Sequence, residues 1–222
     1  MNYKDGPQIQ SNIMKILLTV LSLLFLAGCA TTDRIELGNR DYGQAPVDIY
    51  LVPMEGISAA FASSVAKDIE FRHRLTTKVI TTMGRDDTMF NAEHRQYIAN
   101  VIARHADGII KGLKRPEEQP FILVLTPYDI NAEEFDLRFL FAAHFKGISV
   151  ISTARIDPVN YGLPRDDKLR DQRLMKLVNK AIGQQVLHYP ISSDRGNVMY
   201  GPIMGLDDLD SIGSWYSRQP AN

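Results

Sequence analysis

The stretch Phe121-Ile-Leu-Val-Leu125 is an uninterrupted apolar run between Pro120 and Thr126. A strand with one solvated face alternates apolar and polar residues, whereas an uninterrupted run is typical of a strand that is covered on both faces. We therefore expect this stretch to lie inside a sheet that has helices on its two sides.

Three further runs, rich in β-branched residues, are expected to extend the sheet: 47–52, 78–82 and 147–153. Helical segments alternate with these runs along the chain, which indicates an α/β (α+β) domain with three layers. We expect a mixed, mostly parallel sheet of about four strands with two or three main helices. The C-terminal part, from Ser192 onward, is expected to be rich in loops.

Three helices are expected around these strands. The first covers 59–71, where apolar residues recur at spacings of four. The second has Asn91 as its N-cap and runs to about Leu113, with an apolar stripe that includes Tyr97 and Ile98. The third covers 166–186, and its core-facing residues are expected to be Leu174, Leu177, Val178, Ala181 and Ile182.

The N-terminal part of the chain predicts export and lipid attachment. Lys15 precedes an apolar run at 16–26, which is shorter than the ~20 residues that a membrane-spanning helix needs. The run ends in Leu26-Ala27-Gly28-Cys29, which resembles the lipobox of bacterial lipoproteins. We expect cleavage before Cys29 and lipid on its thiol. The alternative is a buried N-terminal helix that happens to end in Gly-Cys.

These features divide the chain into four parts. Residues 1–13 are polar and precede the signal, so we interpret them as an upstream extension outside the working protein. Residues 14–28 are the expected signal peptide, and 29–46 the acylated cysteine with a flexible tether. Residues 47–222 are expected to form a single globular domain.

Composition limits the partners of this domain. The formal net charge is −1 and no block of Lys and Arg is present, which argues against nucleic acid. The expected membrane contact is therefore the lipid on Cys29 alone. The chain has one cysteine, so neither a disulfide framework nor a thiolate zinc site is expected. By analogy with lipoprotein sorting, Ala30 after the acylated cysteine favours the periplasmic face of the outer membrane if the cell is Gram-negative.

Several segments of the domain, taken in order, resemble the archaemetzincins, a family of metzincin-type zinc metallopeptidases. The segments are Ile49-Tyr-Leu-Val-Pro53, Asn91 with Arg95-Gln-Tyr97, Leu125-Thr126 with Asp129, Gly147 to Arg155, Gly162-Leu-Pro164, and Ser192-Ser-Asp194 with Val198-Met-Tyr200. The resemblance implies a three-layer metzincin-like fold. It also implies that the third expected helix corresponds to the helix that carries the family's zinc motif.

The motif of that family, His-Glu-x-x-His, is missing from this helix. Lys180-Ala-Ile-Gly-Gln184 stands in its place, so the resemblance implies a degenerate site at Lys180, Ala181 and Gln184. Lysine brings a cation where the metal would be, alanine accepts no proton, and glutamine is a poor zinc ligand. No cofactor is therefore expected, and zinc belongs only to an alternative interpretation.

Further candidates are a Met-turn methionine and three residues of a possible cleft. The resemblance implies that Met199 is the methionine of the family's Met-turn, but a methionine that only fills the core would look the same. His188 is placed near the family's third ligand, and His144, His188 and Asp194 could form an unorthodox zinc site. The acidic stretch 207–210 is interpreted as a solvated turn in preference to a calcium site.

Two functions remain open from the sequence. The first is a pseudo-peptidase that binds a peptide or an envelope protein, with an extended ligand added to an edge strand at 147–153. The second is an active zinc-dependent metallopeptidase with non-standard ligands. Fold resemblance does not separate the two, because function depends on the residues of the site.

Overall fold

A five-stranded sheet forms the centre of the domain in the computed structural model, which describes residues 46–133 and 137–217. The strand order is β2 (Thr77–Val79), β1 (Ile49–Pro53), β5 (Phe121–Thr126), β9 (Ile148–Ser152) and β8 (Ala142–Phe145). Neighbouring strands are parallel except for β8, which pairs with β9 in the antiparallel direction. The expected mixed, mostly parallel sheet is confirmed.

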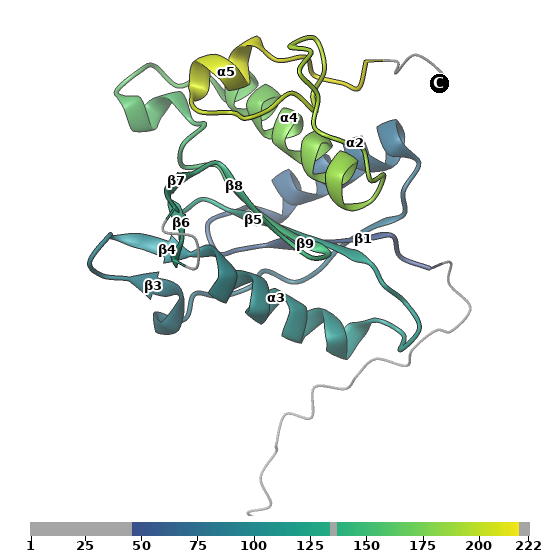
Figure 1. The fold of residues 1–222 in the computed structure, drawn as a ribbon. Coiled ribbons are helices and arrows are strands. Elements are labelled where there is room, and N and C mark those ends of the chain that lie inside the picture. Colours follow the sequence, from purple (N-terminus) through teal and green to yellow (C-terminus); the bar gives the residue numbers. More distant parts are fainter. Residues whose placement is uncertain (1–45, 134–136, 218–222) are drawn as a thin grey trace, which may run out of the picture. The chain divides into compact units, whose positions relative to one another are not determined.

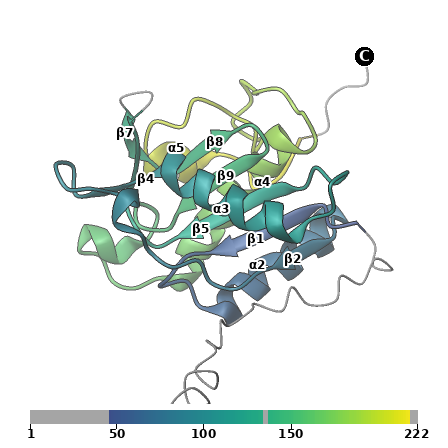
Figure 2. The same ribbon diagram turned by 90° about the horizontal axis from the view of Figure 1, so that it is seen from below.

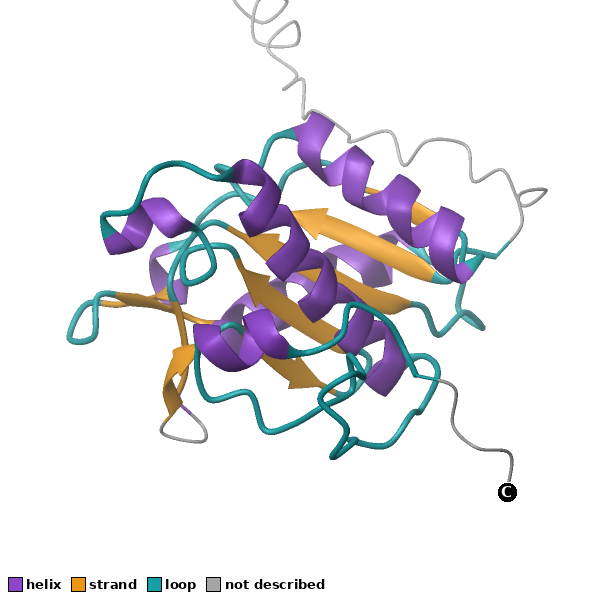
Figure 3. Ribbon diagram, turned by 90° about the horizontal axis from the view of Figure 1, so that it is seen from above, coloured by secondary structure: helices purple, strands orange, loops and turns teal. Residues whose placement is uncertain are grey.

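Helices cover both faces of this sheet, as Figure 1 shows. On one face lie α2 (Ala59–His73) and α4 (Asp167–Gln185), with the short helix α5 (Leu206–Ser211) beyond them. On the other face lies α3 (Ala99–Leu113), which crosses the strands in the view from below (Figure 2). The view from above shows α2 and α4 over the strands (Figure 3). The domain therefore has the three layers that the sequence predicts.

The two core clusters explain why β5 is apolar without interruption. Phe121, Leu123 and Leu125 pack in the cluster that includes α2 and α4, whereas Ile122 and Val124 pack in the cluster that includes α3. Successive side chains of a strand point to opposite faces, so each face of β5 needs its own apolar residues. The prediction for this stretch is confirmed.

The structure also contains a second, four-stranded sheet that the sequence did not predict. Its order is β3 (Phe90–Asn91), β4 (Gln96–Ile98), β6 (Ile130–Ala132) and β7 (Leu137–Leu140). Short 3₁₀ helices at Asp87–Met89 and Pro158–Tyr161 complete the connections.

The second helix begins later than predicted. Asn91 is not its N-cap, because α3 starts at Ala99 and Tyr97 and Ile98 belong to β4. The Asn91 side chain instead accepts a hydrogen bond of 3.0 Å from the backbone N–H of His94 within a tight turn. Arg95 then has φ 53°, a left-handed conformation that does not continue into a helix.

The predicted edge strand is an interior strand. β9 pairs with β5 on one side and with β8 on the other, so 147–153 presents no free edge to a ligand. β8 is the edge strand on this side of the sheet. The chain reverses between β8 and β9 at Gly147, whose φ of 73° favours glycine. The short segment Ala142–Phe145, with its mixed composition, carries little strand signal of its own.

The third helix agrees with prediction. Asp166 is its N-cap and accepts a 2.8 Å hydrogen bond from the backbone N–H of Leu169. The predicted core residues are all buried in the cluster between α4 and the sheet: Leu174, Leu177, Val178, Ala181 and Ile182. The acidic stretch, in contrast, is not simply a solvated turn, because it forms α5 and its Asp210 pairs with Arg173 of α4.

The predicted signal peptide, the lipobox with Cys29, and the tether up to residue 45 lie outside the described residues. Within 46–133 and 137–217, no helix is long and apolar enough to cross a membrane.

Candidate functional site

The candidate site is built around the C-terminal half of α4, in the region where the family's zinc motif would lie. Three segments supply its residues: α4 itself, the edge strand β8, and the loop that carries Met199 and Tyr200.

In the alignment that the resemblance implies, Lys180 corresponds to the first motif histidine. Its side chain is largely buried, with 9% of the residue exposed, and Nζ donates a 2.6 Å hydrogen bond to the carbonyl oxygen of Tyr200. Burial lowers the pKa of the ammonium, because the charged form loses solvation. No Asp or Glu of the described residues forms an ion pair with Lys180.

The other two residues that the resemblance aligns with the motif are Ala181 and Gln184. Ala181 is fully buried in the core between α4 and the sheet. Gln184 has a buried Oε1 that accepts no hydrogen bond from the described residues. The helix therefore presents an ammonium and an amide one turn apart.

Met199 lies directly against this part of α4. A Cβ added to Gly183 would be 2.5 Å from Met199 Sδ and 2.8 Å from Tyr216 Cε1, so both side chains press on the backbone of the helix. Met199 is 1% exposed, and its backbone N–H donates to Asn197 Oδ1 at 2.9 Å. Met199 therefore fills the core beside α4, and the Met-turn role stays a prediction.

His144 extends from β8 toward the same side of the sheet as α4. Ala142 packs in the cluster that includes α4 and Ala143 in the cluster that includes α3, so the alternation of a strand places His144 with Ala142. His144 Nδ1 lies 2.8 Å from Ser149 Oγ. Although part of the side chain is exposed, desolvation lowers the pKa of His144 to about 4, with a further contribution from the Lys180 ammonium. The imidazole is neutral at pH 7.

His188 and Asp194 do not join His144 in a metal site. His188 has φ 54° and lines a different depression, together with Gln185 and Asp48. Asp194 Oδ1 accepts a hydrogen bond of 2.8 Å from the backbone N–H of Gly196 within its own turn. Across 46–133 and 137–217, no group of three His, Cys, Asp or Glu residues could hold a metal ion. The three predicted cleft residues are therefore not brought together.

The residues present at the motif do not fit zinc. A catalytic zinc needs three side chains with lone pairs directed at the metal, usually imidazoles and a carboxylate. Lys180 is a donor without an acceptor atom, and its hydrogen bond to the Tyr200 carbonyl places a positive charge at the motif. This carbonyl is a backbone group, so no sequence pattern could have identified it as the partner.

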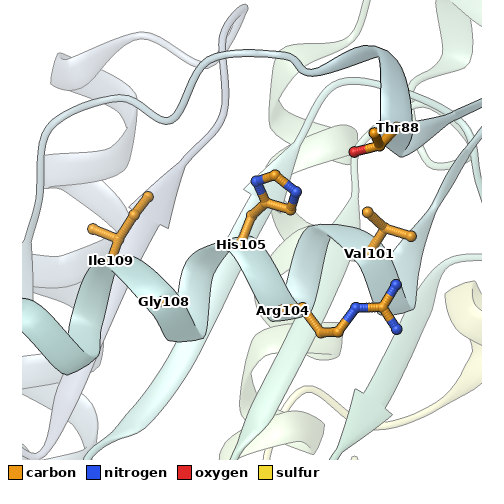
Figure 4. Close-up of a pocket in the computed structure, with 6 residues that line it drawn as sticks. All are labelled: Thr88, Val101, Arg104, His105, Gly108 and Ile109. Atoms are coloured by element: carbon orange, nitrogen blue, oxygen red, sulfur yellow. The ribbon is translucent and has the colours of Figure 1, made fainter.

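The depression shown in Figure 4 lies elsewhere. It has a volume of about 640 Å³ and is lined by Thr88 and by residues along the outer side of α3: Val101, Arg104, His105, Gly108 and Ile109. Because α3 covers the opposite face of the sheet from α4, this depression is separate from the motif region.

Neither a family model nor a curated protein matches the sequence. Several solved structures, in contrast, are similar to the chain in fold. A zinc-dependent peptidase from Methanocorpusculum labreanum has a TM-score of 0.64 and 18% identity, covering 76% of this chain and 95% of that one.

Two archaemetzincins are similar as well. The one from Archaeoglobus fulgidus, in complex with malonate, has a TM-score of 0.59 and 22% identity over 77% of this chain and 95% of its own. The one from Methanopyrus kandleri has a TM-score of 0.58 and 20% identity over 78% and 90%. At these low identities the likeness establishes the architecture and not the chemistry. The chain has the archaemetzincin fold, as the order of its sequence segments predicted.

Proposed function

We propose that this protein is a lipid-anchored pseudo-peptidase, whose archaemetzincin-like domain binds an extended peptide without hydrolysing it. The observation that carries the proposal is the hydrogen bond from Lys180 Nζ to the Tyr200 carbonyl. The resemblance aligns Lys180 with the family's first zinc ligand. A built-in ammonium repels a divalent cation from this position. Ala181 offers no group that could take a proton from water.

The edge of β8 supports the binding part of the proposal. Ser152 N–H donates to the Phe141 carbonyl at 2.9 Å, so hydrogen-bonded pairs alternate along the two strands. The backbone groups of Ala142 and His144 then face away from β9, toward the free edge. An extended peptide could add to this edge as a further strand, with main-chain hydrogen bonds for affinity.

Zinc content and hydrolysis test the absence of catalysis. The full chain, purified in detergent without added metal or chelator, is expected to contain far less than one zinc per chain by atomic emission. It should also leave a pool of decapeptides uncut after zinc is added. One bound zinc per chain together with cleavage would establish the alternative, an active metallopeptidase with non-standard ligands.

Blocking the free edge tests the binding site. The probe is a fluorescent pool of decapeptides, randomised over Val, Thr, Ser and Gln, with free C-termini. Ala142→Pro removes an outward N–H without removing a bond to β9, so it should weaken binding several-fold in fluorescence polarisation. Ala142→Ser keeps the N–H and is the matched control. Equal binding by both variants would exclude the β8 edge as the site.

Lipid attachment is a separate part of the proposal. It is supported by the lipobox resemblance of Leu26-Ala27-Gly28-Cys29 and by the apolar run before it. Cys29→Ala should abolish labelling by a palmitate analogue in cells and should leave the signal peptide uncut, because the thiol is the acceptor. Fractionation of labelled cells would then show whether the protein is in the outer membrane. Undiminished labelling of the variant would refute the lipid anchor.

A further inference from the structure

The charge of Lys180 is incompletely balanced. The side chain is largely buried, yet no carboxylate of the described residues pairs with it, and its recorded hydrogen bond uses one of the three donors of an ammonium. A buried cation without a counter-charge is costly, because solvation is lost and no opposite charge replaces it. Among the described residues, the Lys180 ammonium thus lacks a negatively charged partner.

Groups already present compensate only part of this charge. The Tyr200 carbonyl places a partial negative charge beside Lys180, which lies more than one turn before the end of α4 and so beyond the main effect of the helix dipole. His144 on β8 is neutral at pH 7 because its pKa is lowered to about 4. Among the described residues, none supplies the full negative charge that would neutralise the ammonium.

Gly201 and Ile191 border Nζ on one side. A Cβ on Gly201 would lie 3.5 Å from Lys180 Nζ and 3.2 Å from Ile191 Cγ2, so glycine at position 201 keeps a side chain from pressing on Ile191 beside the ammonium. Ile191 itself is 53% exposed. His144, from the edge strand, lies on the same side of the sheet. The ammonium and the proposed peptide edge therefore belong to one region.

We infer that Lys180 binds the C-terminal carboxylate of a peptide that lies along β8. This inference rests on the peptide-binding function proposed above and specifies its ligand. An internal peptide carbonyl could accept a hydrogen bond from Nζ but carries no net charge, whereas a terminal carboxylate supplies the missing negative charge and a strong, charge-assisted hydrogen bond. The position used for cleavage in the peptidases would here hold the end of a chain.

Three matched peptide pools test the inference with the full chain in detergent. All are fluorescent decapeptides randomised over Val, Thr, Ser and Gln. The first ends in a free carboxylate, the second in an amide, and the third in an amide with one Glu at an internal position. We expect the first pool to bind at least about tenfold more tightly than the other two. Lys180→Met should remove this preference, and Lys180→Arg should keep most of it.

A second variant keeps the test decisive if Lys180→Met does not fold. Gln184→Glu places a carboxylate one turn from Lys180, where it should compete with the ligand and reduce the preference. Equal binding of the free and amidated pools would overturn the inference and leave peptide binding intact. Tight binding of the third pool would overturn it in favour of an acidic side chain. No binding by any pool would overturn both proposals.

Discussion

Among single residues, Lys180 has the largest consequence for the chemistry of the site. A zinc motif needs imidazole lone pairs on one face of the helix, and lysine offers only N–H donors there. The hydrogen bond to Tyr200 also ties α4 to the loop that carries Met199. One side chain thus offers no lone pair to a metal while it is protonated, and it forms part of the contact between helix and loop.

Gly183 lies where α4 has no room for a side chain. An alanine Cβ would come within 2.5 Å of Met199 Sδ and 2.8 Å of Tyr216 Cε1. Gly183→Ala should therefore lower the free energy of unfolding by about 1–3 kcal/mol, as overpacked cores do. Urea denaturation followed by circular dichroism measures this change.

The matched control for Gly183→Ala is Gly108→Ala. Gly108 lies inside α3, and a Cβ there meets nothing within 4 Å. This variant should be more stable than the natural protein by about 0.5–1 kcal/mol, because alanine has the higher helix propensity. A loss of stability in the control equal to that of Gly183→Ala would contradict the packing explanation.

His144 predicts how stability depends on pH. Its pKa is about 4 in the folded protein, against an ordinary 6.5, because desolvation and then Lys180 disfavour the charged form. Between these two pKa values the unfolded chain binds more protons at His144 than the folded chain does. The contribution of the neutral His144 to stability is therefore complete above pH 6.5 and is lost as pH falls toward 4. His144→Gln should lessen the fall in unfolding free energy over this window. Parallel curves for both proteins would show that His144 does not titrate in this way.

At the level of the elements, α4 packs its apolar face against one side of the sheet. Leu177 is 4% exposed and packs in the same cluster as β1 and β5. Leu177→Ala should lower the free energy of unfolding by about 2–5 kcal/mol, because a buried side chain is lost and a cavity remains. Leu163→Ala, at a residue that is 58% exposed, is the control and should change stability by less than about 0.5 kcal/mol. Similar losses for the two variants would mean that another face of α4 forms the core.

At the level of the whole domain, a few polar contacts join segments that are far apart in the sequence. Arg173 of α4 donates to both carboxylate oxygens of Asp210 in α5, at 2.7 and 2.6 Å, and to the carbonyl of Ile156 at 3.0 Å. The Arg173 side chain is 7% exposed and that of Asp210 is 39% exposed. These contacts connect the C-terminal segment to the helix of the candidate site.

Removing this connection should loosen the C-terminal segment. Arg173→Met is expected to cost about 1.5–3 kcal/mol, the range for hydrogen bonds to charged groups, and to speed cleavage after residue 191 in limited proteolysis. Arg165→Met removes a pair whose side chains are 75% and 46% exposed, so it should change neither quantity measurably. If Arg173→Met is as resistant to protease as Arg165→Met, α5 is held by its apolar contacts alone.

Much of the fold could be read from local patterns. Apolar patterns indicate which faces of an element are buried. Three of them were informative here: the uninterrupted run at 121–125, the spacing of apolar residues in 166–186, and the order of strands and helices. The lysine, alanine and glutamine at the motif positions were also visible in the chain. The first three features predicted the three layers that the structure has.

Other features depend on contacts between segments distant in the chain. β8 is too short to have a clear pattern, and it becomes the edge only because it pairs with β9. Asn91 looks like an N-cap, but its side chain closes a turn between two strands. Lys180 finds its partner in a backbone carbonyl, which every residue possesses, so no residue type marks it. Pairing, edges and backbone partners arise when distant segments meet, and for this reason a one-dimensional pattern does not contain them.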